Sequence, residues 1–150
     1  MDDMTVKKVA LAGNPNTGKS LVFSRITGTG VISANYPGTT VSVKRARFTF
    51  RAAGFELVDL PGVYSLEPFS AADKVAVSEI DNADIIINII DATTLERNLN
   101  LTLELISRNK PIVVCLNFWD DTAHKGISID TTALQRLLGV PVVTASALNG

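Results

Sequence analysis

The sequence predicts a three-layer α/β/α fold, in which helices cover both faces of a mostly parallel six-stranded sheet with one antiparallel strand. Three observations lead to this fold class. Apolar, β-branched runs alternate with helical patterns along all 150 residues. Two of these runs, residues 85–91 and 112–116, are almost continuously apolar, which is typical of strands buried on both faces. A glycine-rich loop, residues 13–20, joins the first run to the first helical segment.

The first part of the chain is expected to hold a strand over residues 6–12 and a helix over residues 19–27, which opens at the glycine-rich loop. Residues 28–40 are polar and rich in glycine without periodicity, so they predict a mobile loop. Residues 41–51 and 55–59 then predict a strand pair, because both are rich in strand-forming residues around a turn at Ala52-Ala53-Gly54.

The second part continues the alternation. An irregular segment over residues 60–72 leads to a short helix over residues 73–80 and to the buried strand 85–91. Residues 94–109 predict a helix, because Leu95, Leu99, Leu103 and Ile106 form one apolar stripe. The remaining elements are the buried strand 112–116, a helix over 131–138 and a last strand over 140–144.

Composition indicates one globular domain with a normal core, because 46% of the residues are hydrophobic and 19% are charged. The net charge of −1 provides no basic field for a nucleic acid. Cys115 is the only cysteine and is expected as a buried strand thiol, and His124 as a solvated loop residue, so no direct iron site is expected. The acidic N-terminus lacks a signal peptide pattern, and the apolar runs are too short to span a bilayer, so a soluble, cytosolic domain is expected.

The glycine-rich loop is the most specific motif in the chain. The run Gly13-Asn14-Pro15-Asn16-Thr17-Gly18-Lys19-Ser20 matches G-x-x-x-x-G-K-[ST] and lies between an expected strand and an expected helix. In such a loop, backbone N–H groups surround nucleotide phosphates, and the next helix points its positive end at them. We expect Lys19 to reach the β- and γ-phosphates and Ser20 to bind Mg²⁺. Residues from Gly13 to Leu21 are therefore assigned to phosphate binding.

Two motifs that follow other expected strands should gather at the same edge of the sheet. Asp59-Leu60-Pro61-Gly62 has the form D-x-x-G, in which the aspartate can hold the Mg²⁺ shell and the glycine N–H can meet a γ-phosphate. Asn117-Phe118-Trp119-Asp120 has the form N-x-x-D. A carboxylate at Asp120 can accept two hydrogen bonds from guanine, whereas adenine has no matching donors. Each motif alone is weak evidence for a nucleotide site, but the motifs together, in this order and each after a strand, are strong evidence.

The last expected strand is followed by Ser146-Ala147-Leu148, where a backbone N–H could donate to guanine O6. With Thr39 and Thr40 in the expected mobile loop, these motifs resemble the Ras-like GTPases. The runs Asn35-Tyr36-Pro37-Gly38-Thr39-Thr40-Val41 and Asp59-Leu60-Pro61-Gly62-Val63-Tyr64-Ser65-Leu66 narrow the resemblance to the N-terminal G domain of the ferrous iron transporter B (FeoB) family. The stretch from Asp91 to Leu99 is also similar to that family, so the resemblance covers nearly the whole chain.

The resemblance implies a GTP- and GDP-binding switch domain that uses Mg²⁺ and K⁺. Residues 36–40 would form the first switch segment (Tyr36, Pro37, Gly38, Thr39, Thr40), and residues 59–63 the second (Asp59, Leu60, Pro61, Gly62, Val63). Thr40 would meet Mg²⁺ together with Ser20, Asp59 would lie in the outer Mg²⁺ shell, and Asn16 would bind K⁺. From the residues alone, Asn16 as a cation ligand and Asn16 as a turn-capping residue are equally supported.

The resemblance also implies partners within a longer chain: a last G-domain helix, a helical regulatory domain and a membrane-embedded transport region, placing this domain at the cytoplasmic face of the inner membrane. Residues 1–150 are expected to be the G domain, ending just after its guanine-side loop. The family more often has Trp and Val where Tyr36 and Thr39 stand, so Thr39 and Thr40 are alternative metal ligands. GTPases usually have lysine at the position of Phe118, so Phe118 is expected to pack across the base without a charge.

The expected chemistry is slow GTP hydrolysis. Val63 occupies the place of the water-orienting glutamine, and neither switch region carries an arginine. Arg45 and Arg47 are expected on a strand as solvated residues. Catalysis would then depend on Lys19, Asn16 with K⁺, and Thr40 with Mg²⁺. The alternatives are an ATP-using small-molecule kinase, an RNA- or ribosome-associated GTPase, and a nucleotide-sensing module with negligible hydrolysis. N-x-x-D disfavours the kinase, and the mild net charge disfavours an RNA partner.

Overall fold

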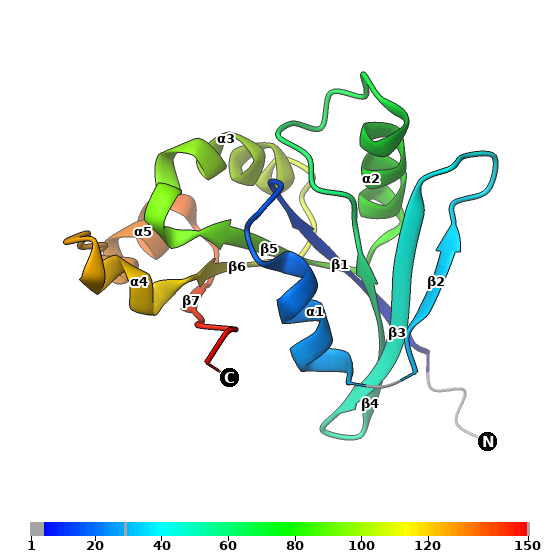
Figure 1. The fold of residues 1–150 in the computed structure, drawn as a ribbon, viewed down its shortest axis with the longest axis horizontal. Helices are drawn as coiled ribbons and strands as arrows, with labels where there is room; N and C mark the ends of the chain where they lie inside the picture. Colours follow the sequence, from blue (N-terminus) through cyan, green and yellow to red (C-terminus); the bar gives the residue numbers. More distant parts are fainter. Residues whose placement is uncertain (1–4, 29, 150) are drawn as a thin grey trace.

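A seven-stranded sheet forms the centre of the molecule, with strand order β2-β3-β4-β1-β5-β6-β7 (Figure 1). The structure is a computed structural model that describes residues 5–28 and 30–149, so the acidic start of the chain lies outside it. The strands are β1 (Lys7–Gly13), β2 (Ile32–Asn35), β3 (Ser42–Phe50), β4 (Ala53–Asp59), β5 (Ile85–Asp91), β6 (Ile112–Asn117) and β7 (Val142–Thr144). The helices are α1 (Lys19–Thr27), α2 (Ala71–Asn82), α3 (Leu95–Ile106), α4 (Trp119–His124) and α5 (Thr131–Leu138).

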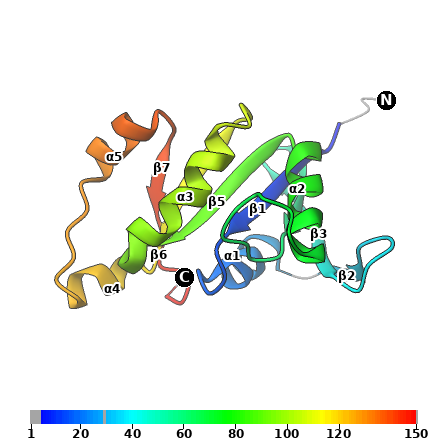
Figure 2. The ribbon, with the colours of Figure 1, turned by 90° about the horizontal axis from the view of Figure 1, so that it is seen from above.

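Helices cover both faces of the sheet, as the sequence predicts (Figure 2). Side chains alternate along β1, so Ala10 and Ala12 pack with α2 and α3, whereas Val9 and Leu11 pack with Phe23 of α1. Helix α5 lies on the same face of the sheet as α3, at its far end, where the apolar side of α5 packs against β6. The α/β/α fold class is confirmed. Strand β3 pairs antiparallel with both β2 and β4, and the other neighbouring strands pair in parallel.

The strand count is corrected from six to seven. The predicted irregular segment 28–40 contains β2, which pairs with β3 from Ile32 opposite Arg45 to Asn35 opposite Ser42. All four residues of β2 are exposed, so the segment has no buried side that apolar alternation could reveal. This edge strand therefore forms because it pairs with β3, and the local sequence alone does not predict it.

Helix α4 was also missed, and it places His124 in a helical last turn instead of the predicted loop. It starts after Phe118, whose φ of 57° is left-handed. Other boundaries also differ from the prediction. The β3–β4 turn lies at Arg51 and Ala52, both with positive φ, so β4 already begins at Ala53. Helix α2 begins before the predicted start, because Ser70 and the Asp73 side chain form a capping box.

Two predictions about the core concern the thiol on β6 and the apolar side of α3. Cys115 is 7% exposed on β6, and burial raises the pKa of its thiol to about 11. Helix α3 ends at Ile106, three residues early, and its fully buried apolar residues are Leu101 and Leu105. Leu95, Leu99 and Ile106 of the predicted stripe are partly buried, but Leu103 is 58% exposed, so the predicted stripe is wrong at that position. Across residues 5–28 and 30–149, each helix is too short or too polar to cross a membrane.

Candidate functional site

The glycine-rich loop connects β1 to α1 and borders a cavity of about 390 Å³, lined by residues 14–21 and Gly62. Gly18 has a φ of +80°, and a Cβ there would lie 2.3 Å from the Asn117 amide nitrogen. A side chain at Gly18 is therefore excluded by both backbone conformation and space. Gly62 approaches the same loop from β4, because a Cβ at this position would lie 2.9 Å from the Pro15 backbone.

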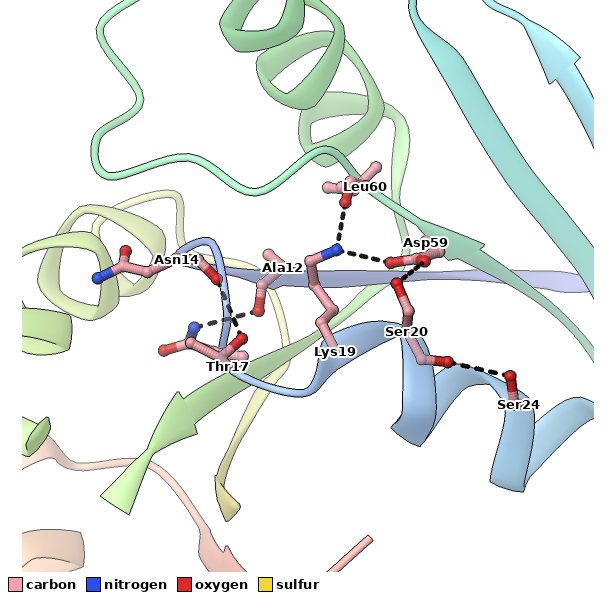
Figure 3. Close-up of polar contacts among 9 residues, drawn as sticks. Ala12, Asn14, Thr17, Lys19, Ser20, Ser24, Asp59 and Leu60 are labelled. Carbon is pink, nitrogen blue, oxygen red and sulfur yellow. Dashed lines mark hydrogen bonds and ion pairs between the residues drawn. The ribbon is translucent and has the colours of Figure 1, made fainter. Parts of the chain in front are cut away.

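Lys19, Ser20 and Asp59 form a polar cluster at this cavity (Figure 3). The Lys19 ammonium group donates to Asp59 Oδ1 at 2.7 Å and to the Leu60 carbonyl oxygen, and Lys19 is only 9% exposed. The Ser20 hydroxyl donates to Asp59 Oδ2 at 3.1 Å. The ends of two neighbouring parallel strands, β1 and β4, thus bring two sequence motifs into direct contact. Hydroxyl and carboxylate oxygens held together in this way are ligands that suit Mg²⁺.

The second switch segment is tied to β1 through its backbone. The Leu60 N–H donates to Leu11 O at 3.2 Å, and the Val63 N–H donates to Gly13 O at 3.1 Å. Val63 itself is 3% exposed and packs in the core, so its side chain faces away from water. Glu104 of α3 accepts hydrogen bonds from the Ser65 hydroxyl and the Leu66 N–H. Sequence reasoning missed Glu104, because no motif marks a carboxylate on the exposed side of a helix.

Asn117 joins the glycine-rich loop to the C-terminal loop, residues 145–149. Its amide nitrogen donates to Thr17 O at 3.0 Å, and its Oδ1 accepts from the Ala147 N–H at 3.2 Å. Asn117 is fully buried, so both bonds are shielded from water. Of the backbone N–H groups in residues 146–148, one of which was expected to meet guanine O6, that of Ala147 is therefore already bonded to Asn117 in this structure. Phe118 packs on the glycine-rich loop, with its Cζ 3.1 Å from where a Gly18 Cβ would lie.

Asp120 lies exposed beside the C-terminal loop. Hydrogen bonding from Ser146 is the main cause that lowers the pKa of this carboxyl, and Asn149 adds to it. The Asn149 amide donates to Asp120 Oδ2 at 2.6 Å, and the Asp120 N–H donates to the Ser146 hydroxyl. Arg25 of α1 holds the same loop, with its Nε donating to Ala147 O at 3.0 Å. Neither Asn149 nor Arg25 was predicted, because their contacts cross between distant parts of the chain. Leu148 is exposed and contributes a carbonyl oxygen to Arg25.

The first switch segment is not near the Lys19 cluster. It lies between β2 and β3 at the outer edge of the sheet, separated from β1 by β3 and β4 (Figures 1 and 2). The Tyr36 hydroxyl pairs with the Ser78 hydroxyl of α2 at 2.8 Å. Thr39 closes a local turn, donating to Tyr36 O and accepting from the Val41 N–H. Thr40 is exposed and, within the described residues, makes no hydrogen bond with Ser20 or Asp59.

Asn16 is exposed at the top of the glycine-rich loop and has a left-handed φ of 64°. Asparagine tolerates this backbone conformation better than most residues, so the turn itself accounts for part of its presence. Residues 5–28 and 30–149 hold no group of three or more His, Cys, Asp and Glu side chains that could bind a metal ion.

Arg45 differs from the prediction of a solvated strand residue. It forms an ion pair with Glu79 of α2, which is 4% exposed, and a longer one of 3.5 Å with Glu56. Hydrogen bonding to Glu79 is the main cause that raises the pKa of Arg45. The pair ties β3 to α2 and leaves Arg45 remote from the Lys19 cluster. Arg47 is exposed, as expected.

Comparison with known proteins identifies the family. A sequence profile described as ferrous iron transport protein B matches residues 7–150. The Fe(2+) transporter FeoB of Legionella pneumophila is 43% identical over 143 residues, which cover 91% of this chain and 19% of that protein. An Fe(2+) transport protein A/Fe(2+) transporter FeoB fusion protein of Porphyromonas gingivalis is 40% identical over 97% of this chain and 18% of its own length. The chain thus spans about a fifth of the length of these curated relatives.

Solved structures agree with the sequence match. The cytosolic domain of the T. maritima FeoB iron transporter in a GDP form superposes with a TM-score of 0.92 at 39% identity, covering 97% of this chain and 58% of that one. An S. thermophilus NFeoB mutant bound to mGDP gives a TM-score of 0.91 at 41% identity, covering 97% and 56%. The agreement of profile, relatives and fold shows that this chain belongs to the ferrous iron transport protein B family, as its N-terminal G domain.

Proposed function

We propose that this domain binds GTP and GDP and hydrolyses GTP slowly, as the regulatory switch of a ferrous iron transporter. The observation that carries the proposal is the cluster of Lys19, Ser20 and Asp59 at the mouth of the glycine-rich cavity. It brings an ammonium group, a hydroxyl and a carboxylate to the edge of the loop, which is the donor set that a phosphate chain with Mg²⁺ needs. The GDP in the T. maritima FeoB structure and the mGDP in the S. thermophilus structure support guanine nucleotides as the ligand class.

In this proposal the Lys19 ammonium group leaves Asp59 and contacts the phosphates when the nucleotide binds. This group is desolvated and paired with a carboxylate, so the incoming phosphate oxygens replace one anionic partner by another. Ser20 and Asp59 then hold Mg²⁺ directly and through the outer shell. Thr40 completes the site only after the first switch segment leaves α2, which requires the Tyr36–Ser78 bond to break. Within residues 5–28 and 30–149 the Thr40 hydroxyl makes no hydrogen bond, which supports Thr40 over Thr39, whose hydroxyl is used in the local turn.

Guanine selectivity would come from Asp120. An exposed aspartate is ionised at neutral pH, and hydrogen bonding from Ser146 lowers the pKa of this carboxyl further, so a carboxylate is available to accept from guanine donors. Asn149 occupies one of its oxygens and must move when a base binds. The Phe118 ring against Gly18 supports the idea that packing replaces the usual lysine stem.

The slow rate of GTP hydrolysis is inferred from the side chains that would have to assist the reaction. Val63 packs into the core and cannot orient water, and Arg45 is paired with Glu79 instead of facing the phosphates. An arginine finger is worth about 10³–10⁵ in rate, so its lack predicts a slow intrinsic reaction. The Asn16 amide, which is exposed, would hold K⁺ beside the phosphates, and Lys19 and loop N–H groups would stabilise the developing charge.

Single-turnover hydrolysis of GTP tests the proposal. We expect Mg²⁺-dependent release of phosphate that is faster in KCl than in NaCl of equal concentration, and we expect Asn16→Asp to change this cation dependence. GTP and GDP should displace a fluorescent guanine nucleotide, whereas ATP should not. Equal rates of hydrolysis in KCl and NaCl would contradict the proposed role of K⁺. Tight binding without turnover in either salt would instead leave a nucleotide-sensing module.

The iron-transport context is part of the same proposal. The curated relatives are transporters about five times as long as this chain, so the remaining parts of such a protein, a helical regulatory domain and a membrane region, are the proposed partners. In that context the domain would lie at the cytoplasmic face of the inner membrane. Fe²⁺ uptake by cells carrying the full transporter with Lys19→Ala would test the link, and wild-type uptake would contradict it.

A further inference from the structure

Glu104 of α3 is a half-buried carboxylate that bonds to the stretch of chain just after the second switch segment. Its Oε1 accepts from the Ser65 hydroxyl at 2.9 Å, and its Oε2 accepts from the Leu66 N–H at 2.9 Å. Within residues 5–28 and 30–149 it forms no ion pair with a lysine or arginine. A partly desolvated carboxylate needs donors, and here neutral groups of this stretch supply them.

Glu104 is also the only group outside residues 64–69 to which these residues hydrogen-bond within the described part of the chain. Their remaining hydrogen bonds stay inside the stretch. The Leu66 side chain is 6% exposed and packs in the core, whereas Tyr64 and Phe69 are 68% and 85% exposed. Removing the carboxylate would therefore leave the Leu66 N–H without its acceptor and free the polar backbone of this stretch.

The same stretch follows Gly62, which lines the glycine-rich cavity. The next residue, Val63, is fixed by its N–H, which donates to Gly13 O at 3.1 Å. Gly62 is exposed, and its own N–H has no hydrogen-bond acceptor among residues 5–28 and 30–149. It lies so close to the loop that a Cβ would be 2.9 Å from the Pro15 backbone. The structure thus holds an unused backbone donor against the cavity before any ligand binds.

We propose that Glu104 is a positioning residue that strengthens the binding of GTP relative to GDP. By holding Ser65 and Leu66 on α3, it keeps Gly62 docked at the cavity, where the Gly62 N–H donates to the γ-phosphate. A donor that is already ordered costs less entropy when the ligand arrives. This role rests on the proposed function, because it assumes that the glycine-rich loop holds the phosphates of a guanine nucleotide.

The contacts of Lys19 indicate why Glu104 matters most in the bound state. Without nucleotide, the Lys19 ammonium group also holds this region, by donating to the Leu60 carbonyl oxygen. In the proposed function this group moves to the phosphates, so that hold is lost on binding. Glu104 does not line the glycine-rich cavity, and its two hydrogen bonds can persist. GDP has no γ-phosphate for Gly62 to meet, so its affinity should not depend on Glu104.

Affinities for a fluorescent GDP and for a fluorescent, non-hydrolysable GTP analogue test this role. In Glu104→Ala the affinity for the GTP analogue should fall about three- to tenfold, as expected for the loss of one hydrogen bond, while the affinity for GDP changes by less than about twofold. Glu104→Gln should bind both as the wild type does. Its Oε1 can accept from the Leu66 N–H while its Nε2 donates to the Ser65 oxygen. Glu96→Ala, at an exposed glutamate of the same helix, is the matched control and should also bind both normally.

Three results would overturn the role of Glu104. Equal losses for the two nucleotides in Glu104→Ala would reduce Glu104 to general support of the fold. Unchanged or tighter binding of the GTP analogue would mean that its contacts do not position Gly62 for the γ-phosphate. A loss in Glu104→Gln as large as in Glu104→Ala would contradict the hydrogen-bonding reason. Should Glu104→Ala fail to fold, Ser65→Ala removes one of the two contacts from the other side, and about a threefold loss for the GTP analogue alone is expected.

Hydrogen exchange of the nucleotide-free chain checks the positioning step without any ligand. The amides of Val63 and Leu66 should exchange faster in Glu104→Ala than in the wild type, and at the wild-type rate in Glu104→Gln and Glu96→Ala. Unchanged exchange in Glu104→Ala would overturn the role of Glu104 even if nucleotides bind. A wild-type chain that binds neither nucleotide would instead overturn the proposed function, so the two failures are distinguishable.

Discussion

Replacing Asn117 with alanine should destabilise the fold as well as weaken nucleotide binding. The side chain is completely buried and makes two hydrogen bonds, to the Thr17 carbonyl oxygen at 3.0 Å and from the Ala147 N–H at 3.2 Å. Removing it leaves one backbone acceptor and one backbone donor unpaired away from water. It also disconnects the glycine-rich loop from the C-terminal loop.

The expected cost can be estimated from these two groups. Each buried group left without a partner costs about 1–3 kcal/mol, so the two together cost about 2–5 kcal/mol after partial relief by water. The free energy of unfolding of a domain this size is about 5–15 kcal/mol, so this loss is a large fraction of it. An exposed hydrogen bond of the same kind would cost far less.

Urea unfolding followed by circular dichroism measures this cost, with Asn100→Ala on α3 as a matched control. Asn100 is exposed, so its replacement should change the free energy of unfolding by less than about 0.5 kcal/mol. Affinity for a fluorescent GDP should fall at least tenfold in Asn117→Ala under folding conditions, because both loops that border the base lose their common anchor. A variant as stable as the control would refute the argument that this bridge holds the two loops together.

Three further results are expected. Asn149→Ala should raise GDP affinity several-fold in a fluorescence titration, because it frees the Asp120 carboxylate from an internal donor; unchanged affinity would show that Asn149 does not compete with the base. Tyr36→Phe should increase hydrogen exchange over residues 36–41 by removing the hydroxyl contact with α2, while Tyr64→Phe, at an exposed tyrosine, should not; equal exchange in both would contradict the tether. Burial raises the pKa of the Cys115 thiol to about 11, so very little thiolate is present at pH 7.5. Its labelling by a disulfide reagent should be slow in the folded protein, rise about tenfold per pH unit toward pH 11, and become fast in urea; fast labelling of folded protein at pH 7.5 would disprove its burial.

The predicted fold class and the gathering of motifs at one sheet edge both rest on local features. Continuous apolar runs identify the central strands β5 and β6, and each motif directly follows its strand. Because parallel strands point their carboxyl ends the same way, the glycine-rich loop and the D-x-x-G motif were predicted to lie at one edge of the sheet. The structure agrees, but the direct contact between Lys19 and Asp59 at 2.7 Å also needs β1 and β4 to be neighbours, which chain order does not predict.

Other features depend on the tertiary structure because their partners are far apart in the chain. Strand β2 exists through pairing with β3, and Arg45 is neutralised by Glu79, which lies 34 residues away. The contact between Asn149 and Asp120, and the position of the first switch segment against α2, likewise leave no local pattern.

The sequence by itself therefore determined the α/β/α fold class, the family resemblance and the glycine-rich loop with its lysine and serine, because periodicity and short motifs are local properties of the chain. The tertiary structure alone decided which polar atoms are satisfied. Asn14 and Asn98 look like ordinary polar residues in the sequence, and only packing of α3 against the loop buries both and leaves one oxygen of each without a hydrogen-bond partner within the described residues. Hydrogen-bond satisfaction is set by three-dimensional neighbours, and no one-dimensional pattern encodes it.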